Sequence, residues 1–320
     1  MEILTQLFGL IIGMTLLIKG ADWFVEGASN IARSLKIPSL IIGLTLVSLG
    51  TSLPELGISL SAALAGSNAI SLGNVIGSNV FNTLVAIGAA ALFVPLAVSK
   101  DMKKYDLPIF MGICVLLGIF SFVITPGILS RIESAILVSL LIIYTVHLCV
   151  RSKKNDLPVE EIETNGKTWY ANVALALLGA GCIIYGSDVV VENAKGIASV
   201  LGMSESLVGL TVVAVGTSLP ELITGVVAAR KGEYDIAIGN AVGSDIFNIL
   251  LILGTCSMFT PATVGIAYLA DFGFMLLSAV LVFVLSWKKM QINKKHGIIL
   301  LSTYAVFLAF IITRFLWFGI

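Results

Sequence analysis

The stretch GLTLVSLGTSLPEL, residues 43–56, decides the fold of this chain because it returns almost unchanged as GLTVVAVGTSLPEL, residues 209–222. A second pair follows in step, SLGNVIGSNVFN at 71–82 and AIGNAVGSDIFN at 237–248. The offset between partners is 166 residues in both pairs (209 − 43 and 237 − 71). The chain is therefore an internal duplication, and a repeat of this kind must be recognised before any fold is assigned.

The composition indicates a membrane protein. Hydrophobic residues make up 58% of the chain and charged residues 12%, whereas soluble domains average about 25% charged residues. A water-soluble protein of this length could not bury so much apolar surface. The first residues lack a basic segment and run directly into a long apolar stretch, so we interpret them as a first span and not as a cleaved signal peptide. The cysteines fall in or beside apolar runs without CxxC spacing, which favours buried small side chains over a disulfide framework.

Apolar runs long enough to cross a bilayer occur throughout the chain. A spanning helix needs about 20 mostly apolar residues. Ten such runs are present, at 3–25, 38–64, 71–93, 106–125, 132–150, 169–191, 205–229, 236–258, 262–286 and 297–318. Open sheets are excluded in lipid and the runs are too long for barrel strands, so we predict an all-α polytopic membrane protein. A polar linker at 151–168 separates two five-helix halves, residues 1–150 and 169–320, of one transport domain.

The distribution of Lys and Arg predicts the orientation. Taken alternately, one set of connectors carries nearly all the basic residues, including Lys103, Lys104, Arg151 and Lys231, and this set should be cytoplasmic. Ten spans then place both termini outside. Because five is an odd number, the second half enters the membrane from the opposite side. We therefore predict an inverted repeat, the architecture of secondary transporters in which interrupted helices meet at the bilayer midplane.

The GTSLPE motif should break its helix. A proline inside a helix has no N–H and clashes with the carbonyl four residues back. Pro54 therefore frees the carbonyl of Gly50. In the second copy, Pro220 frees the carbonyl of Gly216. Such breaks are tolerated in membranes only where protein or a water-filled cavity covers them, which predicts polar backbone groups facing a central site.

Positions that share one helical face, nearly all with oxygen-bearing side chains, gather around these breaks. The positions are Ser48, Thr51, Ser52 and Glu55 in the first copy, Ala214, Thr217, Ser218 and Glu221 in the second, Ser78 with Asn82, and Ser244 with Asn248. Carboxylate, amide, hydroxyl and carbonyl oxygens suit a hard cation such as Ca²⁺. The absence of His and Cys from this set argues against zinc or copper. Carboxylates at the bilayer centre cost about 2.5–3.5 kcal/mol each even on a lenient scale, so they need a cation, a proton or a partner.

GTSLPE followed by GNxxGSxxxN, twice, resembles the α-repeats of the sodium/calcium exchanger family, within the cation/calcium antiporter superfamily. The likeness is greatest to the short prokaryotic and archaeal members. It implies electrogenic exchange of Na⁺ for Ca²⁺ by alternating access, with the first and sixth helices sliding past the core. It also implies that Glu55 and Glu221 share the central Ca²⁺ and neighbouring Na⁺. The remaining ligands implied are Thr51, Ser52, Thr217, Ser218, Asn82, Ser78, Ser244 and Asn248, with backbone carbonyls of Ser48 and Ala214 at outer Na⁺ sites.

The chain departs from the family pattern at the end of the second motif. Some relatives, including potassium-dependent exchangers, have Asp where this chain has Asn248. With neutral amides at both Asn82 and Asn248, we expect a site with two acids and no K⁺ requirement. Asp245 replaces the neutral Asn79 of the first copy. It is a possible ligand, although a role at a rim or in an interhelical hydrogen bond is the more conservative interpretation.

Other functions remain open at this stage. A proton-coupled Ca²⁺ antiporter is the main alternative, because carboxylates can carry protons. An ion channel would need a continuous polar path, and no HExxH or GxSxG motif supports an enzyme. We therefore expect a multi-pass cell-membrane transporter that acts as a monomer. Ca²⁺ and Na⁺ are its substrates, and it needs no cofactor and no nucleic acid. Asp22, Glu26, Asp188 and Glu192, near the ends of the first and sixth spans, are interpreted as interfacial or access-path charges.

Overall fold

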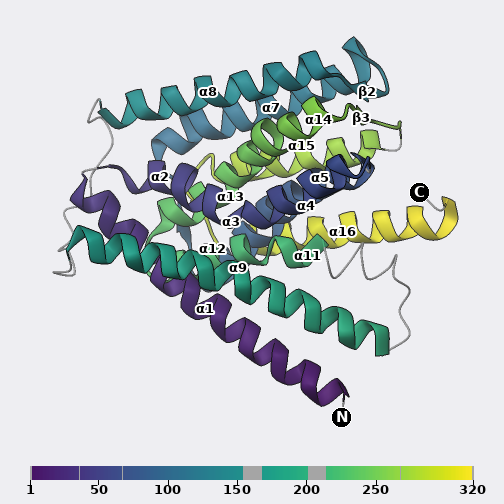
Figure 1. Cartoon of the computed structure of the whole chain (residues 1–320). Coiled ribbons are helices and arrows are strands. Elements are labelled where there is room, and N and C mark those ends of the chain that lie inside the picture. The colour runs from purple at the N-terminus through teal and green to yellow at the C-terminus, as the bar shows by residue number, and fades with distance from the viewer. Residues whose placement is uncertain are drawn as a thin grey trace.

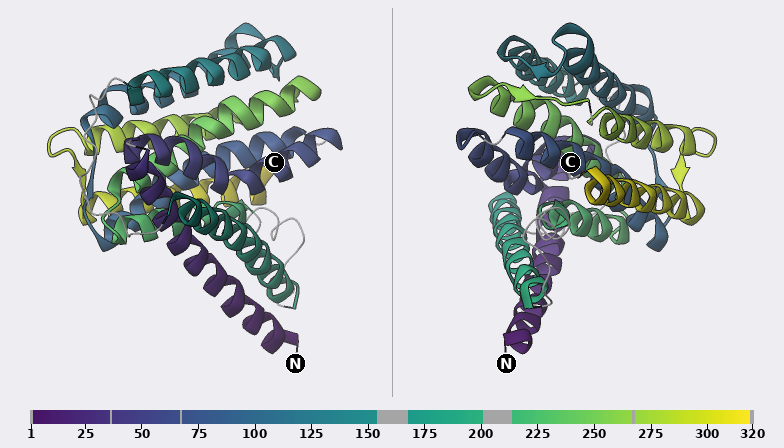
Figure 2. Two further views of the ribbon diagram at one scale, coloured as in Figure 1. Left: turned by 60° about the vertical axis from the view of Figure 1, so that its left-hand side comes forward. Right: turned by 90° about the vertical axis from the view of Figure 1, so that its right-hand side faces the viewer.

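The computed structural model describes residues 2–35, 37–66, 68–153, 168–200, 214–266 and 268–318, almost all of them helical. Two long helices, α1 (Glu2–Ser34) and α9 (Trp169–Val200), cross and project together from one side of a helical bundle (Figures 1 and 2). The bundle contains the remaining helices of both halves. The prediction of an all-helical membrane protein is confirmed.

The helices of the first half follow the predicted runs. They are α2 (Ser39–Ile42), the π-helical turn η1 (Gly43–Val47), α3 (Ser48–Thr51), α4 (Leu53–Leu64), α5 (Asn68–Phe81), η2 (Asn82–Ala86), α6 (Ile87–Phe93), η3 (Met102–Asp106), α7 (Leu107–Ile119), η4 (Phe120–Ile124) and α8 (Arg131–Lys153). Those described in the second half, after α9, are α11 (Ala214–Thr217), α12 (Leu219–Arg230), α13 (Tyr234–Phe247), η6 (Asn248–Leu253), α14 (Gly254–Phe259), α15 (Tyr268–Leu285) and α16 (Lys294–Phe318).

Short strands join the halves at their loops. β1 (Leu96–Ala97) pairs antiparallel with β4 (Gln291–Ile292), and β2 (Ile128–Leu129) pairs antiparallel with β3 (Ala262–Thr263). Each pair contains one strand from each half, so the hydrogen bonds cross between the repeats. β3 also shortens the helix that the run 262–286 predicted, because α15 begins only at Tyr268.

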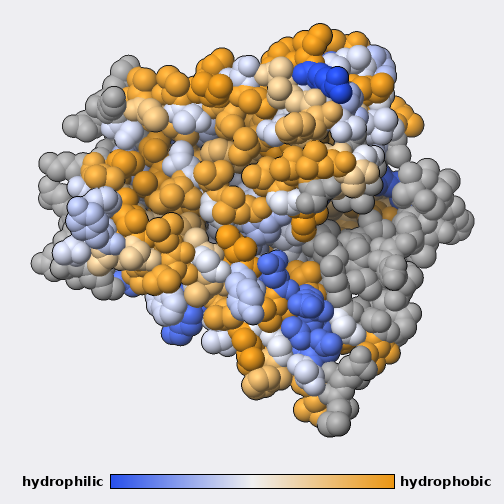
Figure 3. Space-filling view, viewed as in Figure 1, coloured by the Kyte–Doolittle hydropathy of each residue, from blue (hydrophilic) through white to orange (hydrophobic). Residues whose placement is uncertain are grey.

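Eight described helices are long and apolar enough to cross a membrane, and the bent pair Ser39–Thr51 and Leu53–Leu64 makes nine. The tenth predicted run, 205–229, lies partly outside the described residues, so the count of ten stays a prediction. Large apolar side chains cover much of the outer surface of the bundle (Figure 3). An apolar exterior of this extent is suited to lipid. By contrast, α13, η6 and α14 are almost entirely enclosed by other helices, which places this segment at the centre.

Both GTSLPE motifs break their helices. Between α3 and α4 the backbone of Ser52 turns to φ −85° and ψ 7°, and the helical segment Ser39–Thr51 meets α4 at 46°. Ser218 does the same between α11 and α12, with φ −91° and ψ 5°. In each case proline falls in the first turn of the new helix, where its missing N–H costs nothing. The predicted break is confirmed, and the freed carbonyl of Gly216 accepts a hydrogen bond from the Ser187 hydroxyl of α9 at 2.9 Å.

The α1–α9 pair is antiparallel and joined by glycine. A Cβ atom on Gly20 would lie 2.8 Å from the carbonyl oxygen of Gly179, and one on Gly186 would lie 2.9 Å from that of Gly13. Both distances are too short for a real side chain, so the two backbones touch directly. Small residues permit this close approach of helices in membranes. The seam has no interlocking side chains at these positions. α1 itself continues well past residue 25, the predicted end of the first run, to Ser34.

Candidate cation site

Two carboxylates lie at the helix breaks in the centre of the molecule. Glu55 and Glu221 occupy the first turns of α4 and α12, and both are fully buried. A helix N-terminus favours negative charge. Each carboxylate also receives a hydroxyl from the opposite half, since Ser52 donates to Glu221 Oε1 at 2.9 Å and Ser218 donates to Glu55 Oε1 at 3.3 Å. The two broken helices therefore face each other across the site.

Further hydroxyls complete the ring around the carboxylates. Ser244 of α13 donates to Glu221 Oε1 at 3.3 Å, and Thr51 also reaches that carboxylate. Thr217 makes the equivalent contact with Glu55. Every one of these hydroxyl-bearing residues is at least nine-tenths buried. The structure thus brings together the hydroxyl residues that the sequence placed on the helical faces of the two motifs.

Two asparagines that the sequence analysis did not assign hold the helix breaks in place. Asn74 donates its amide nitrogen to the backbone carbonyl of Glu55 at 3.5 Å, and Asn240 donates to that of Glu221 at 3.3 Å. Asn240 also accepts from Thr51 Oγ1 at 3.0 Å. The signal was present in the duplicated Gly-Asn of the second motif, but only the docking of the helices reveals what the side chain bonds to.

The next layer consists of amides on α5, η2, α13 and η6. Asn82 donates to Asp245 Oδ1 at 3.2 Å, and Asn248 donates to Asn79 Oδ1 at 3.0 Å. Thr83 also donates to Asp245, at Oδ2. Asp245 is completely buried, so it does not lie at a rim, and its side chain makes interhelical hydrogen bonds.

Several buried oxygens in this centre have no hydrogen-bond partner. They are Oε2 of Glu55 and of Glu221, Oδ1 of Asn82 and of Asn248, and Oγ of Ser78. Leaving a buried acceptor unsatisfied costs about 1–3 kcal/mol. A set of carboxylate, amide and hydroxyl oxygens is the donor set that Ca²⁺ takes. Within the described residues no group of three His, Cys, Asp or Glu side chains could hold a metal, so a cation here would depend on neutral oxygens besides the two acids.

Ser48 and Ala214 differ from the other predicted positions. The Ser48 hydroxyl donates to the backbone carbonyl of Gly43 at 2.6 Å and also lies near those of Gly239 and Asn240. Its hydroxyl thus packs η1 against α13. The Ser48 carbonyl accepts from the Ser52 backbone N–H at 3.0 Å and from the Thr51 hydroxyl at 3.3 Å, so its role as a Na⁺ ligand stays a prediction. Ala214 begins α11, and its side chain lies outside the described part of the chain.

Ion pairs connect α1 to the turn between α12 and α13. Lys231 Nζ lies 2.8 Å from Asp22 Oδ1, and Arg33 pairs with Glu233. On α9, the corresponding acids Asp188 and Glu192 are exposed. Asp22, one of the acids that we interpreted as access-path charges, therefore has a lysine partner. The sequence did not predict this contact because the two residues lie far apart in the chain.

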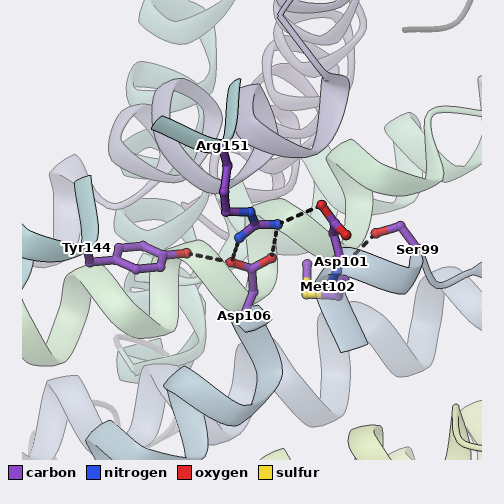
Figure 4. Close-up of polar contacts among 6 residues, drawn as sticks. All are labelled: Ser99, Asp101, Met102, Asp106, Tyr144 and Arg151. Atoms are coloured by element: carbon purple, nitrogen blue, oxygen red, sulfur yellow. Dashed lines mark hydrogen bonds and ion pairs between the residues drawn. The ribbon is translucent and has the colours of Figure 1, made fainter. Parts of the chain in front are cut away.

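A second group of charges lies where α8 ends against η3 and α7. Arg151 binds Asp106 at 2.8 Å and Asp101 at 3.3 Å, and the Tyr144 hydroxyl donates to Asp106 at 3.4 Å (Figure 4). In the other half, an equivalent contact joins Arg314 of α16 to Asp271 of α15 at 3.0 Å. Both pairs tie the ends of a helical hairpin and do not contact the two central glutamates.

Comparison with known proteins extends over nearly the whole chain. The sequence profile described as "Sodium/calcium exchanger protein" matches residues 5–150 and 171–313, with its gap at the polar linker. Inner membrane protein YrbG of Escherichia coli is 36% identical over 310 residues, which cover 94% of each chain. Sodium/calcium exchanger MaX1 of Methanosarcina acetivorans is 33% identical, covering 93% of this chain and 96% of that one. A solved structure of the sodium-calcium exchanger NCX_Mj, soaked with Na⁺ and Ca²⁺, superposes with a TM-score of 0.83 at 28% identity, covering 95% of this chain and 98% of that one.

Proposed function

Because this chain belongs to the sodium/calcium exchanger family and is therefore a multi-pass membrane antiporter for Ca²⁺ and a second cation, we propose that the second cation is Na⁺. Exchange is electrogenic and does not require K⁺. The substrates bind between the two halves, at Glu55 and Glu221, and neither ion is a resident cofactor. The protein carries out transport as a monomer and catalyses no chemical reaction.

The observation that carries this proposal is the set of unpartnered oxygens around two buried carboxylates. Oε1 of each glutamate is held by hydroxyls, whereas Oε2 of Glu55 and of Glu221 has no partner. One Ca²⁺, or a set of Na⁺ ions that includes those shared between the acids, neutralises the pair. A loaded core can then pass the apolar barrier, while the unloaded core carries two charges that are costly in lipid. This difference enforces exchange and prevents leak.

The unpaired amide oxygens favour Na⁺ over a proton as the exchanged ion. Asn82 and Asn248 each leave Oδ1 without a partner. An amide oxygen is a good ligand for a metal cation but is not protonated near neutral pH. A carrier that exchanged Ca²⁺ only for protons would use the carboxylates and leave these two oxygens unsatisfied in its protonated state.

We further propose that the two halves form an inverted repeat of ten spans, with both termini outside and with residues 151–168 as a cytoplasmic linker. Three reciprocal contacts support this architecture. Ser52 and Ser218 each reach the glutamate of the other half. Gly13 contacts Gly186, and Gly20 contacts Gly179. These two contacts exchange under the repeat, as expected for elements related by a two-fold axis. Each of the two small sheets also contains one strand from each half.

In this orientation the path is closed toward the cytoplasm. The second part of α1 packs along α12, and the two ion pairs at the α12–α13 turn hold it there. The related contact on the outer side, between α9 and α4, is far smaller within the described residues. The glycine seam allows α1 and α9 to move together as one pair. Alternating access then consists of exchanging the α1–α12 contact for an α9–α4 contact.

The test is uptake of ⁴⁵Ca²⁺ into proteoliposomes that contain Na⁺ and are diluted into Na⁺-free, K⁺-free buffer. A matched set of proteoliposomes contains no Na⁺ and is diluted into buffer of the same ionic strength but different pH, which creates a pH gradient. We expect uptake only with internal Na⁺, and we expect a Na⁺ ionophore to abolish it. Because electrogenic exchange moves more than two Na⁺ out per Ca²⁺ taken in, net positive charge leaves, and an imposed inside-positive potential should speed uptake. Uptake driven by the pH gradient alone would assign the protein to proton-coupled Ca²⁺ exchange instead.

A further inference from the structure

The amides of Asn82 and Asn248 are each held by a residue of the opposite half. Positions 79 and 245 are partners in the repeat (245 − 79 = 166), as are positions 82 and 248 (248 − 82 = 166). Asn82 of the first half donates to Asp245 of the second at 3.2 Å, and Asn248 of the second donates to Asn79 of the first at 3.0 Å. The two contacts are therefore the same interaction made twice across the pseudo-two-fold axis.

These contacts determine which end of each amide is free. A carboxylate oxygen of Asp245 accepts the bond from Asn82, so the nitrogen of Asn82 faces it. Asn79 is oriented in turn by a backbone carbonyl, because its own nitrogen donates to the carbonyl of Asp245 at 3.1 Å. Its Oδ1 consequently faces Asn248 and receives the nitrogen of that amide. In both cases the nitrogen is bound and Oδ1 is left without a partner.

The difference between the two copies is matched by their surroundings. Asp245 has a second acceptor oxygen where Asn79 has an amide nitrogen. That oxygen accepts a hydrogen bond from Thr83 at 2.5 Å. The residue at the position of Thr83 in the second half is the fully buried Ile249, which offers no donor. The hydroxyl is present only opposite Asp245, where the extra acceptor needs one, which indicates that these contacts are specific.

We propose that Asp245 and Asn79 are positioning residues that orient Asn82 and Asn248 so that their amide oxygens point at the transported cation. Without the acceptor, an amide can rotate by half a turn and place its N–H₂ group toward the ion. An N–H₂ group donates hydrogen bonds only and cannot coordinate a cation. The inference deepens the proposed function, since it rests on Asn82 and Asn248 being ligands, and it assigns Asp245 to orientation and not to direct coordination.

The experiment compares variants that differ in the acceptor but not in charge. Asp245→Asn and Asp245→Ala both remove the carboxylate, but only Asp245→Asn keeps an oxygen that can accept from Asn82. Asn79→Ala removes the equivalent acceptor without any change of charge. Ser278→Ala is the control, because Ser278 is buried and its hydroxyl donates only to the Met275 carbonyl within its own helix. For each purified variant, thermal unfolding is followed against Ca²⁺ concentration, and half-saturating Ca²⁺ is measured for uptake into proteoliposomes.

Asp245→Ala should require at least about tenfold more Ca²⁺ than Asp245→Asn for half-maximal stabilisation, equivalent to ~1.4 kcal/mol. The Ca²⁺ affinity of Asn79→Ala should fall by a similar factor relative to the unmodified protein, and that of Ser278→Ala should not fall. The maximal rate of uptake at saturating Ca²⁺ should be largely kept, because the orientation of the amides affects Ca²⁺ affinity more than it affects the movement of the helices. If Asp245→Ala fails to fold, Asp245→Ser replaces it, since a serine hydroxyl is too short to reach Asn82.

Equal Ca²⁺ affinity of Asp245→Asn and Asp245→Ala, or an unchanged affinity in Asn79→Ala, would overturn the positioning role. Loss of all Ca²⁺ binding in Asp245→Asn would instead make Asp245 a ligand, and that result also overturns the proposal. Thermal stabilisation requires only Ca²⁺ binding, so it tests the positioning role even if Na⁺ proves not to drive uptake. Failure of Na⁺ coupling would appear in the unmodified protein, where it is distinguishable from any effect of these variants.

Discussion

Replacing either central glutamate by glutamine should abolish Ca²⁺ exchange while the protein still folds. Glu55→Gln and Glu221→Gln keep the volume of the side chain and an oxygen that accepts from Ser218 or Ser52. Each variant removes one of the two negative charges that face the cation, and both glutamates are fully buried, with no exposed surface. Breaking a buried ion pair by removing one partner costs about 3–5 kcal/mol, which corresponds to an affinity loss of roughly 150- to 5,000-fold.

The assay measures Ca²⁺-dependent thermal stabilisation of the purified variants, followed by Na⁺-driven ⁴⁵Ca²⁺ uptake. Glu133→Gln is the matched control, because Glu133 is also a buried acid but accepts its hydrogen bonds from Thr125 and Ser130 at the start of α8. Binding by either central variant within about threefold of the unmodified protein, less than 1 kcal/mol, would refute the assignment of this site. An equal loss in Glu133→Gln would show that the measurement reports folding and not coordination.

The remaining predictions concern parts of the fold outside the site. Gly20→Leu should slow exchange without changing Ca²⁺ affinity, because its Cβ would lie 2.8 Å from the α9 backbone and overpacking costs about 1–3 kcal/mol. An unchanged maximal rate of uptake would argue against a need for the close seam when α1 and α9 move together. Arg33→Gln should raise hydrogen exchange at the end of α1 and in the α12–α13 turn, since it loses the ion pair with the buried Glu233. Equal exchange would remove the ion pair from the account of gating. Arg151→Gln should lower the unfolding temperature, because it leaves the buried Asp106 without its ion-pair partner at a cost of about 3–5 kcal/mol. The Ca²⁺ affinity of this variant should be unaffected. A weaker Ca²⁺ affinity would mean that this cluster acts on the site.

Local features of the sequence predicted a large part of the fold. The apolar runs predicted helices because lipid requires every backbone group to bond within its own segment. The motif predicted interruptions at Ser52 and Ser218, since proline breaks helical hydrogen bonding wherever it occurs. The boundaries were less accurate. α1 continues to Ser34, and α15 starts late because residues 262–263 pair as a strand with the other half.

The repeat also revealed the candidate site. Two copies of one motif at a constant offset singled out Glu55 and Glu221, and the helical spacing of their neighbours singled out the hydroxyls. The sequence did not reveal the roles of Asn74 and Asn240, although both lie in the duplicated motif. Nor did it predict the ion pair of Lys231 with Asp22, because its partners are 209 residues apart.

The sequence by itself determined the class of the molecule, the breaks in its helices and the chemistry gathered at those breaks, because these follow from hydrophobicity and from backbone hydrogen bonding within one segment. Only the tertiary structure decided which oxygens remain free. Oδ1 of Asn82 is unpaired because Asp245, from the other half, holds the amide nitrogen. The orientation of a side chain depends on the groups packed against it, and in this protein those groups come from the opposite repeat.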